Sequence, residues 1–176
     1  MPERSDIQEQ ALSPSSHAPI IQRLPEKIWH EHHLRFLAFI QRYGEKRITR
    51  WTMKRLASDM SIVRDPEGGI WVAHDHGRIL GLLAIQKAGI ELSMIVVHPC
   101  YRRTGIGASL LETALRTTRR LYARISAENI PSLRLAMSTG FTIIDHRTTR
   151  NGQTIFILAR GAWQEKEAQA CAASVF

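Results

Sequence analysis

The chain has 176 residues, of which 44% are hydrophobic and 23% charged, so it is long enough for one globular domain with a buried core. No apolar run approaches the roughly 20 residues of a membrane-spanning helix. Residues 1–16 are polar and lack the apolar centre of a secretory signal. We therefore expect a cytoplasmic protein without a membrane partner. Two cysteines, Cys100 and Cys171, are too few for a disulfide scaffold.

The chain is strongly basic. Its 24 Lys and Arg residues exceed its 16 Asp and Glu residues, for a formal net charge of +8. Such a balance attracts phosphates, nucleic acids or acidic surfaces, and it is also typical of a solvated basic surface. Residues 102–124 contain six arginines and one acidic residue, Glu112. The arginines are Arg102, Arg103, Arg116, Arg119, Arg120 and Arg124. This clustering predicts an anionic ligand.

Hydrophobic periodicity and turn residues predict alternating helices and strands after a disordered tail at residues 1–17. We expect, in chain order, a strand at 18–24, helices at 25–43 and 49–60, strands at 70–74, 79–87 and 91–97, a helix at 105–118, a strand at 121–126, a helix at 129–139, and strands at 141–148 and 154–159. In the second helix, Trp51, Leu56 and Met60 are candidate inward residues.

This order predicts a single α/β domain of mixed α+β type over residues 18–161, rather than a regular βαβ alternation. The closing hairpin turns at Asn151-Gly152, a strong turn signal. Residues 162–176 are rich in Ala, Gln and Glu, and we expect a loose tail or a short terminal helix there.

One segment, residues 98–108, joins a predicted strand to a predicted helix and carries two glycines. The start of a helix presents free backbone N–H groups and the positive end of the helix dipole, which together suit phosphate. Gly105 and Gly107 remove side chains where a ligand approaches the backbone, and Arg102 and Arg103 add positive charge. We interpret the segment as a diphosphate-binding loop.

Two familiar phosphate loops fit this segment less well. A Walker A loop has Gly-Lys-Ser/Thr where this chain has Gly107-Ala108-Ser109, so the lysine is missing. A Rossmann loop has a third glycine where this chain has Leu110, although Glu128 follows the next strand at a suitable distance. The upstream strands are also predicted to be antiparallel. We reject the first alternative and disfavour the second.

The segment resembles the acyl-CoA loop of the GNAT acetyltransferase superfamily. The resemblance covers about residues 70–159 and rests on Arg102-x-x-Gly105-x-Gly107 after Val97-x-Pro99 and before Leu110-Leu111, and on Asn129, Ser132 and Gly140-Phe141. It implies a central, mostly antiparallel sheet of six to seven strands, splayed between its central strands and flanked by about four helices.

The resemblance implies acetyl-CoA as cosubstrate. The pantetheine arm would lie between strands 91–97 and 121–126 like an added strand, and an amide near Val97 would stabilise the oxyanion. Asn129 would reach the arm, a role compatible with capping the helix that follows it. The implied cofactor-binding residues are Ile95, Val96, Val97, Arg102, Arg103, Thr104, Gly105, Ile106, Gly107, Ala108, Asn129 and Ser132.

Acetylation of an amine requires a route for the amine proton and for protonation of the departing thiolate. Many family members place a catalytic glutamate where this chain has Glu91, and strand alternation puts Glu91 on the same face as Ile95 and Val97. We predict that Glu91 acts as the base, directly or through water; the alternative is a surface carboxylate. The family's tyrosine, seven residues after the asparagine, is replaced by Ala136, so Ser138, a water or a tyrosine from elsewhere is a candidate substitute. The thiolate can also leave unaided, because the pKa of a thiol is modest.

Other clusters favour no second site. His30, His32 and His33 crowd one helical turn without acidic or cysteine partners at ligand spacing, so we expect no metal. Cys100 is a candidate reactive thiol in the loop. The predicted second helix and the residues before it form a basic run that is a candidate contact for nucleic acid or an acidic acceptor: Lys46, Arg47, Arg50, Lys54 and Arg55.

We therefore predict an acetyltransferase that moves an acetyl group from acetyl-CoA to a primary amine by direct attack in a ternary complex. The acceptor is a small molecule or a protein that the sequence does not identify. A CoA-binding regulatory module without turnover is the alternative, motivated by Ala136. A nucleic-acid partner is a third and less favoured reading. A monomer and a homodimer are both compatible with the sequence.

Overall fold

The computed structural model describes residues 18–44, 48 and 50–173. The helices and strands, in chain order, are β1 (Ile20–Arg23), α1 (Glu26–Tyr43), α2 (Arg50–Ser58), α3 (Ser61–Arg64), β2 (Gly69–Asp75), β3 (Arg78–Gln86), η1 (Lys87–Gly89), β4 (Leu92–Val97), η2 (Pro99–Tyr101), α4 (Ile106–Thr118), β5 (Arg120–Ser126), α5 (Ile130–Ser138), β6 (Thr142–Thr148), β7 (Thr154–Gly161) and α6 (Glu165–Ala173). The predicted order is confirmed. The short α3 and the C-terminal α6 add to the four helices that were expected.

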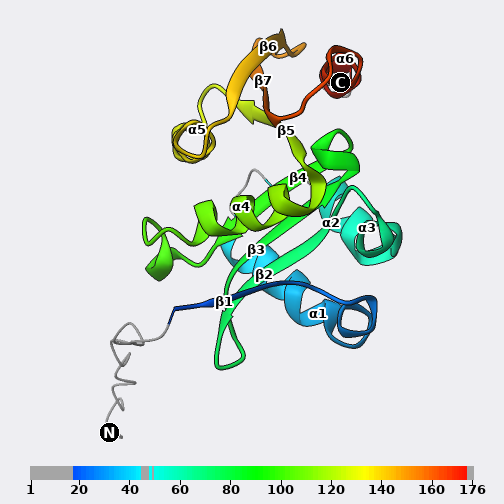
Figure 1. The fold of residues 1–176 in the computed structure, drawn as a ribbon, viewed down its shortest axis with the longest axis vertical. Helices are drawn as coiled ribbons and strands as arrows, with labels where there is room; N and C mark the ends of the chain where they lie inside the picture. Colours follow the sequence, from blue (N-terminus) through cyan, green and yellow to red (C-terminus); the bar gives the residue numbers. More distant parts are fainter. Residues whose placement is uncertain (1–17, 45–47, 49, 174–176) are drawn as a thin grey trace, which may run out of the picture.

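The strands form two antiparallel sheets, one ordered β1-β2-β3-β4 and the other β5-β7-β6. Figure 1 shows the smaller sheet above the larger one, with the edge strands β5 and β4 nearest to each other. Within the described chain, no ladder joins β4 to β5. This arrangement confirms a mixed α/β fold. Its antiparallel strands form two groups that separate between the central strands β4 and β5.

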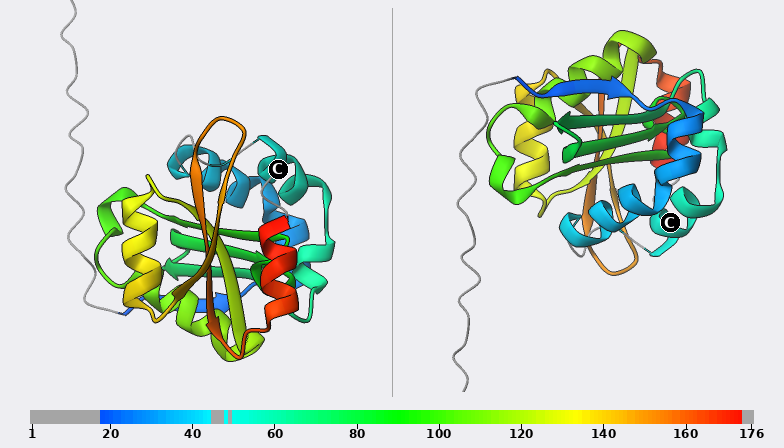
Figure 2. Two further views of the ribbon diagram at one scale, coloured as in Figure 1. Left: turned by 90° about the horizontal axis from the view of Figure 1, so that it is seen from above. Right: turned by 90° about the horizontal axis from the view of Figure 1, so that it is seen from below.

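The larger sheet is covered on both faces. Alternating side chains of β4 separate the two layers: Leu92, Met94 and Val96 pack with α1, α2 and α3, whereas Ile95 and Val97 pack on the α4 side. Trp29, 1% exposed, anchors α1 in the first layer, and Leu110, 0% exposed, anchors α4 in the second. In Figure 2, α5 and α6 flank the smaller sheet.

The C-terminal segment forms a helix over Glu165–Ala173, so a loose tail is not what the structure has there. Ala168, Cys171 and Ala172 are buried against Tyr122 of β5 and Ile157 of β7. Their burial explains the helix, because a short alanine-rich segment gains most of its stability from packing. The predicted tail at residues 1–17 lies outside the described residues.

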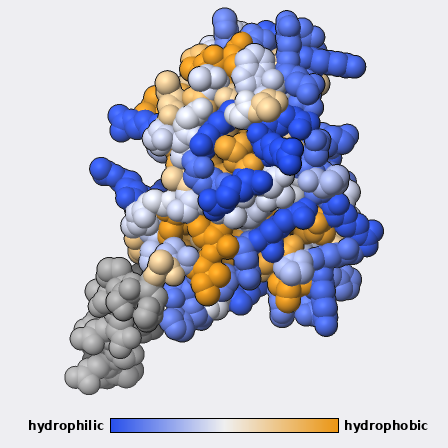
Figure 3. All heavy atoms as spheres, in the orientation of Figure 1, coloured by the Kyte–Doolittle hydropathy of each residue, from blue (hydrophilic) through white to orange (hydrophobic). Residues whose placement is uncertain are grey.

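The surface exposes one of the aromatic side chains that the sequence placed inward. Trp51 is 56% exposed rather than inward, and its ring lies 5.1 Å from the Arg55 guanidinium carbon, whereas Leu56 is buried as predicted. On the face drawn in Figure 3, separate apolar patches lie among hydrophilic side chains. No helix in the described part of the chain has both the length and the hydrophobicity to cross a bilayer.

Candidate functional site

The loop after β4 turns the chain sharply into α4. The short helix η2 is followed by Arg103 with φ of 65° and by Gly105 with φ of 89°, and Gly105 is the N-cap residue of α4. Among the described residues, no side-chain hydrogen bond from the N-cap residue caps this end of α4. The N–H groups of Ile106, Gly107 and Ala108 therefore have no partner within the helix and point out of its first turn.

The two glycines of the loop act in different ways. A Cβ on Gly105 would meet nothing within 4 Å, so this glycine is required by its backbone conformation and leaves open space beside the amides. A Cβ on Gly107 would lie 3.0 Å from the Leu135 side chain. Gly107 thus allows α4 to pack closely on α5, rather than clearing space for a ligand as its sequence position suggested.

The loop carries two cationic side chains and a hydroxyl side chain. Arg102, Arg103 and Thr104 are all exposed. Arg102 Nε donates to the Val97 carbonyl at 3.3 Å, and the Thr104 hydroxyl donates to the Tyr101 carbonyl at 2.7 Å. The loop therefore presents backbone amides and positive charge at the end of β4, as predicted for a diphosphate site.

The outer edge of β4 offers backbone groups to the gap between the sheets. The His98 N–H donates to the Leu80 carbonyl at 2.8 Å, and Val96 pairs opposite Leu82. Because hydrogen bonding alternates along an antiparallel strand, the N–H and C=O groups of Ile95 and Val97 face away from β3, on the side of β5. The backbone of Val96 faces β3 instead, and its side chain is buried toward α1, so the structure places this predicted contact away from the gap.

At the other end of β4 the two sheets close on each other. Gly89 has φ of 98°, and a Cβ there would lie 2.0 Å from the Tyr122 carbonyl oxygen of β5. Arg124 of β5 donates to the carbonyls of Ile90 at 2.6 Å and Glu91 at 3.0 Å. The two sheets are therefore held together at Gly89–Glu91, which we call the apex, and beyond it no ladder joins β4 to β5 in the described residues.

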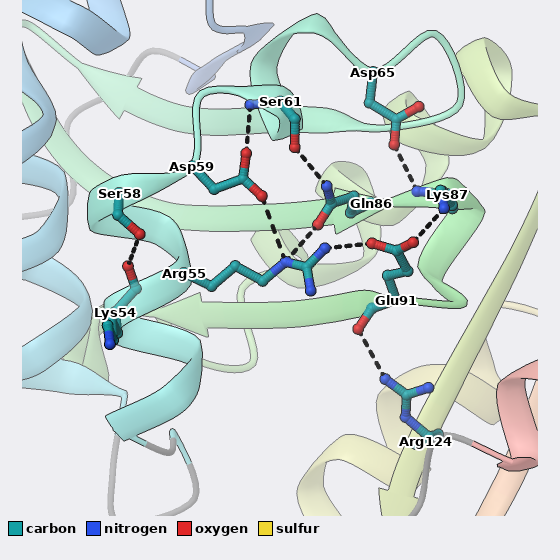
Figure 4. Close-up of polar contacts among 10 residues, drawn as sticks. All are labelled: Lys54, Arg55, Ser58, Asp59, Ser61, Asp65, Gln86, Lys87, Glu91 and Arg124. Carbon is teal, nitrogen blue, oxygen red and sulfur yellow. Dashed lines mark hydrogen bonds and ion pairs between the residues drawn. The ribbon is translucent and has the colours of Figure 1, made fainter.

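Glu91 lies at this apex, in a bend just before β4 begins at Leu92. Its carboxylate contacts the guanidinium of Arg55 and the ammonium of Lys87, whereas its carbonyl faces Arg124 (Figure 4). Strand alternation therefore does not fix the direction of this side chain. The carboxylate points toward α2, not along the gap with Ile95.

These contacts also set the ionisation of Glu91. The hydrogen bond from Lys87, with the nearby Arg55, holds the pKa of the Glu91 carboxyl below its usual range. Arg55 is fixed in turn by Gln86, whose side-chain oxygen accepts from Arg55 Nε at 2.8 Å and whose amide donates to Ser61 at 2.8 Å. A carboxylate stabilised in this way is a weak base at neutral pH.

The helix α5 carries the second set of predicted residues. Asn129 is its N-cap, and Asn129 Oδ1 accepts from the Ser132 N–H at 3.3 Å. Ala136 is 4% exposed and packs with the core under α4 and α5. Ser138 is exposed, and its hydroxyl donates to the Leu135 carbonyl of the same helix at 2.9 Å. The capping role of Asn129 is present, and the Ser138 proton is engaged within α5.

The arginines that cluster in sequence do not cluster in space. Arg120 pairs with Glu67 at 2.8 Å and Glu167 at 2.6 Å, and the latter hydrogen bond, chiefly, raises the pKa of Arg120. Arg124 donates to the Ile90 carbonyl at the apex, and Arg116 donates to the Thr113 hydroxyl of its own helix at 3.1 Å. Of the six, Arg102 and Arg103 lie in the loop itself.

His98, which the sequence did not single out, is half-buried at the end of β4. Its ring lies 4.5 Å from that of Tyr43 and 5.6 Å from that of Tyr101, between centroids. Burial, followed by the charges of Arg78, Arg42 and Arg102, lowers the pKa of His98. Because Nδ1 accepts from the Cys100 N–H at 3.3 Å, the neutral ring carries its hydrogen on Nε2 and caps the turn.

The two thiols differ in accessibility. Cys100 is exposed in the loop, and Cys171 is buried. Burial raises the pKa of the Cys171 thiol, so this sulfur is not an activated nucleophile. The described residues contain no group of three or more His, Cys, Asp or Glu side chains that could hold a metal ion.

In the described residues, the strands divide between β4 and β5 and the loop after β4 leads into the start of α4, an α/β arrangement that suits an extended, diphosphate-bearing ligand. The chain belongs to the acetyltransferase (GNAT) family, whose model matches residues 26–141. Acetyl-CoA is the cosubstrate of this family. Gly105, with open space at its Cβ position beside the free amides, fits a phosphate there.

Similar proteins support the assignment. An uncharacterised N-acetyltransferase of Mycobacterium bovis is 32% identical over 96 residues, which cover 50% of this chain and 62% of the relative. Counterparts in two Mycobacterium tuberculosis strains match equally. The match thus spans less than two thirds of the length of these relatives.

Solved structures share the fold. The ribosomal-protein-S18-alanine N-acetyltransferase of Escherichia coli has a TM-score of 0.62 at 22% identity, over 83% of this chain and 95% of that one. The structure of yncA from Salmonella typhimurium, determined with its cofactor acetyl-CoA, has a TM-score of 0.57 at 17% identity, over 85% and 96%.

Proposed function

We propose that the protein transfers an acetyl group from acetyl-CoA to a primary amine by direct attack in a ternary complex. The observation that carries this proposal is the outer edge of β4, which pairs with no other strand in the described part of the chain and is followed by the loop that leads into the N-terminus of α4. An edge strand can pair with the amide groups of a pantetheine arm, and the helix start can hold a pyrophosphate.

The proposal assigns binding to named residues. The amides of Ile106, Gly107 and Ala108, with Arg102 and Arg103, bind the pyrophosphate, and the loop conformation set by Thr104 and Gly105 presents them. The outward backbone groups of Ile95 and Val97 orient the arm, and the Val97 N–H donates to the carbonyl oxygen on which charge develops. Asn129 and Ser132 at the start of α5 form the opposite wall.

Glu91 has a positioning role in this proposal. Its contacts with Arg55 and Lys87 tie the start of β4 to α2, and this tie fixes the apex from which the gap opens. The amine loses its proton to solvent or to a group of the acceptor complex. The thiolate needs no strong acid, because the pKa of a thiol is modest. Ser138→Ala tests this point, and we expect it to leave kcat within about twofold.

A turnover assay tests the proposal. Thiol release from acetyl-CoA is followed with a panel of primary amines: a peptide with an N-terminal alanine, lysine peptides and polyamines. Mass spectrometry identifies the acetylated product. The peptide is included because two similar solved structures are ribosomal-protein-alanine N-acetyltransferases. Amine-dependent thiol release with an acetylated product is expected; release that does not depend on any amine contradicts transfer.

A matched glycine pair tests the binding site. Gly105 and Gly152 both have positive φ, of 89° and 80°, and neither Cβ position has a neighbour within 4 Å. Both alanine variants should therefore carry a similar strain of about 1 kcal/mol. Only Gly105→Ala should weaken CoA binding, by roughly tenfold, because only this residue shapes the amides of the loop. Equal weakening of CoA binding in both variants would show that the loop is not part of the binding site.

A second candidate function is acetyl-CoA sensing without turnover. It is favoured by the buried Ala136 at the family's tyrosine position and by the engaged carboxylate of Glu91. Tight CoA binding by calorimetry, together with no acetylated product across the panel, would support the sensor and overturn the transferase.

A further inference from the structure

An open cationic pocket of about 280 Å³ lies on the surface, outside the gap between the sheets. We name it the arginine pocket. It is lined by the second half of α1, the start of β3 and His98, and its cations are Arg35, Arg42 and Arg78. Its size is close to the lower end, about 300 Å³, of pockets that bind small molecules. The volume suits a small ligand.

Two of the three guanidiniums, those of Arg35 and Arg42, come from α1, and the third comes from Arg78 at the start of β3, which lies opposite Asp75 in the ladder with β2. None of the three forms an ion pair with a carboxylate in the described residues. The acid of the neighbouring hairpin, Asp75, contacts His76 Nδ1 at 2.7 Å. Like charges gathered in one cavity repel one another, so their free energy falls when an anion enters.

Each guanidinium is held in a way that leaves donors available. Arg35 donates one N–H to the Gly77 carbonyl. The guanidinium carbon of Arg42 lies 5.5 Å from the centre of the Tyr43 ring, and that of Arg78 lies 5.7 Å from the centre of the Tyr101 ring. Stacking uses the face of a guanidinium and leaves its N–H edge for an oxyanion. Side chains that are already positioned lose less entropy when a ligand binds.

The positive potential in this cavity is also felt by His98, whose pKa is lowered by burial and then by Arg78, Arg42 and Arg102. Apolar side chains complete the wall: Phe39 is 7% exposed and Ile79 is 9% exposed. The cavity therefore combines an anion-binding side with an apolar side.

We propose that the arginine pocket binds the phosphate group of a small phosphorylated molecule other than coenzyme A. A phosphate dianion carries three terminal oxygens that accept from guanidinium donors, and it neutralises more of the local charge than a single carboxylate. The short carbon skeleton of the ligand packs on Phe39 and Ile79. The pocket adjoins the pyrophosphate loop at His98, but its three cations lie outside residues 98–108, so the inference goes beyond acetyl transfer and does not depend on it.

Calorimetric titration of the full chain with phenyl phosphate tests the proposal. Saturating coenzyme A is present so that the pyrophosphate loop is already filled. We expect saturable binding of phenyl phosphate, weaker binding of inorganic phosphate, which lacks the apolar part, and weaker binding of benzoate at equal ionic strength. No saturable binding, or benzoate binding as tightly as phenyl phosphate, would overturn the proposal.

Variants locate the binding. Arg42→Ala and Arg78→Ala should each weaken phenyl phosphate binding by roughly tenfold, because each removes charged hydrogen bonds. Lys27→Ala, which removes a cation from the same helix outside the pocket, should leave it unchanged. Arg42→Lys keeps the charge but loses the planar fork, and should fall between the two. Unchanged binding in the arginine variants, with melting curves showing that they are folded, would overturn the proposal.

Discussion

Glu91 shows how far a residue's position in sequence can differ from its orientation in the structure. Its place at the start of the central strand suggests a catalytic base. Its carboxylate is instead held by Arg55 and Lys87 and has a lowered pKa. The sequence could not indicate this, because Arg55 lies 36 residues away and the bend at Glu91 interrupts strand alternation.

Glu91→Gln separates a base from a positioning residue. A catalytic base typically contributes 10²- to 10⁴-fold. We expect kcat/KM to fall by less than about tenfold, with the shape of its pH profile unchanged. A loss of more than about a hundredfold in kcat/KM at neutral pH would show that Glu91 is the catalytic base.

Lys87→Met gives an independent check of the same residue. The ammonium of Lys87 is the chief cause of the lowered pKa of Glu91, so its removal moves that pKa upward toward the ordinary value. If Glu91 were the base, the acidic limb of the kcat/KM profile would move to higher pH. We expect this limb to stay in place, measured from about pH 3.5 to pH 9 so that the range includes the ordinary glutamate pKa of about 4.3, because Glu91 does not exchange the proton.

At the scale of elements, the turn that contains η1 joins the two sheets at the apex. Gly89 meets the Tyr122 carbonyl, and Arg124 binds two carbonyls of the same turn. The order of helices and strands, and the glycine loop before α4, were predictable because they depend on local periodicity and turn residues. The apex was not predictable, because it joins η1 to β5, and the whole of β4 and α4 lies between these two elements in the sequence.

Gly89→Ala tests the apex. The added Cβ would lie 2.0 Å from the Tyr122 oxygen, at a φ of 98°. We expect a loss of about 3 kcal/mol in the free energy of unfolding, from strain and overlap together. Gly77→Ala is the matched control, with φ of 78° and no neighbour within 4 Å, and should cost about 1 kcal/mol. Equal losses in urea denaturation would show that Gly89 is not a close contact.

The ion pair of α6 predicts a pH dependence of stability. Hydrogen bonding from Arg120 is the main cause that lowers the pKa of Glu167, and the Tyr122 hydroxyl also donates to this carboxylate at 2.8 Å. The unfolded chain therefore takes up the proton at higher pH than the folded one. The stabilisation is complete above the ordinary pKa of about 4.5 and is lost as the pH falls through the folded value.

Glu167→Gln should accordingly cost about 1–2 kcal/mol at neutral pH, and its difference from the wild type should shrink toward about pH 3. Glu165→Gln, an exposed neighbour in the first turn of α6, is the control and should change little. Denaturant titrations across this pH range measure both variants. A difference that does not depend on pH would contradict the assignment.

At the scale of the whole molecule, the net charge of +8 is divided among several tasks. Arg120 fixes α6, Arg124 fixes the apex, and Arg55 fixes α2, so a sequence cluster of arginines did not predict a single anionic site. The residues of the arginine pocket are dispersed in sequence from Arg35 to His98, and only the packing of α1 on the β2–β3 hairpin assembles them. Such clusters depend on tertiary contacts that composition and spacing do not encode.

A crystal structure of the protein with coenzyme A tests the central claim most directly. The account predicts that the pantetheine arm lies between β4 and β5, that its amides pair with the outward backbone groups of Ile95 and Val97, and that the pyrophosphate meets the amides of Ile106, Gly107 and Ala108. Coenzyme A bound elsewhere, or β4 and β5 joined by a ladder in its presence, would contradict it.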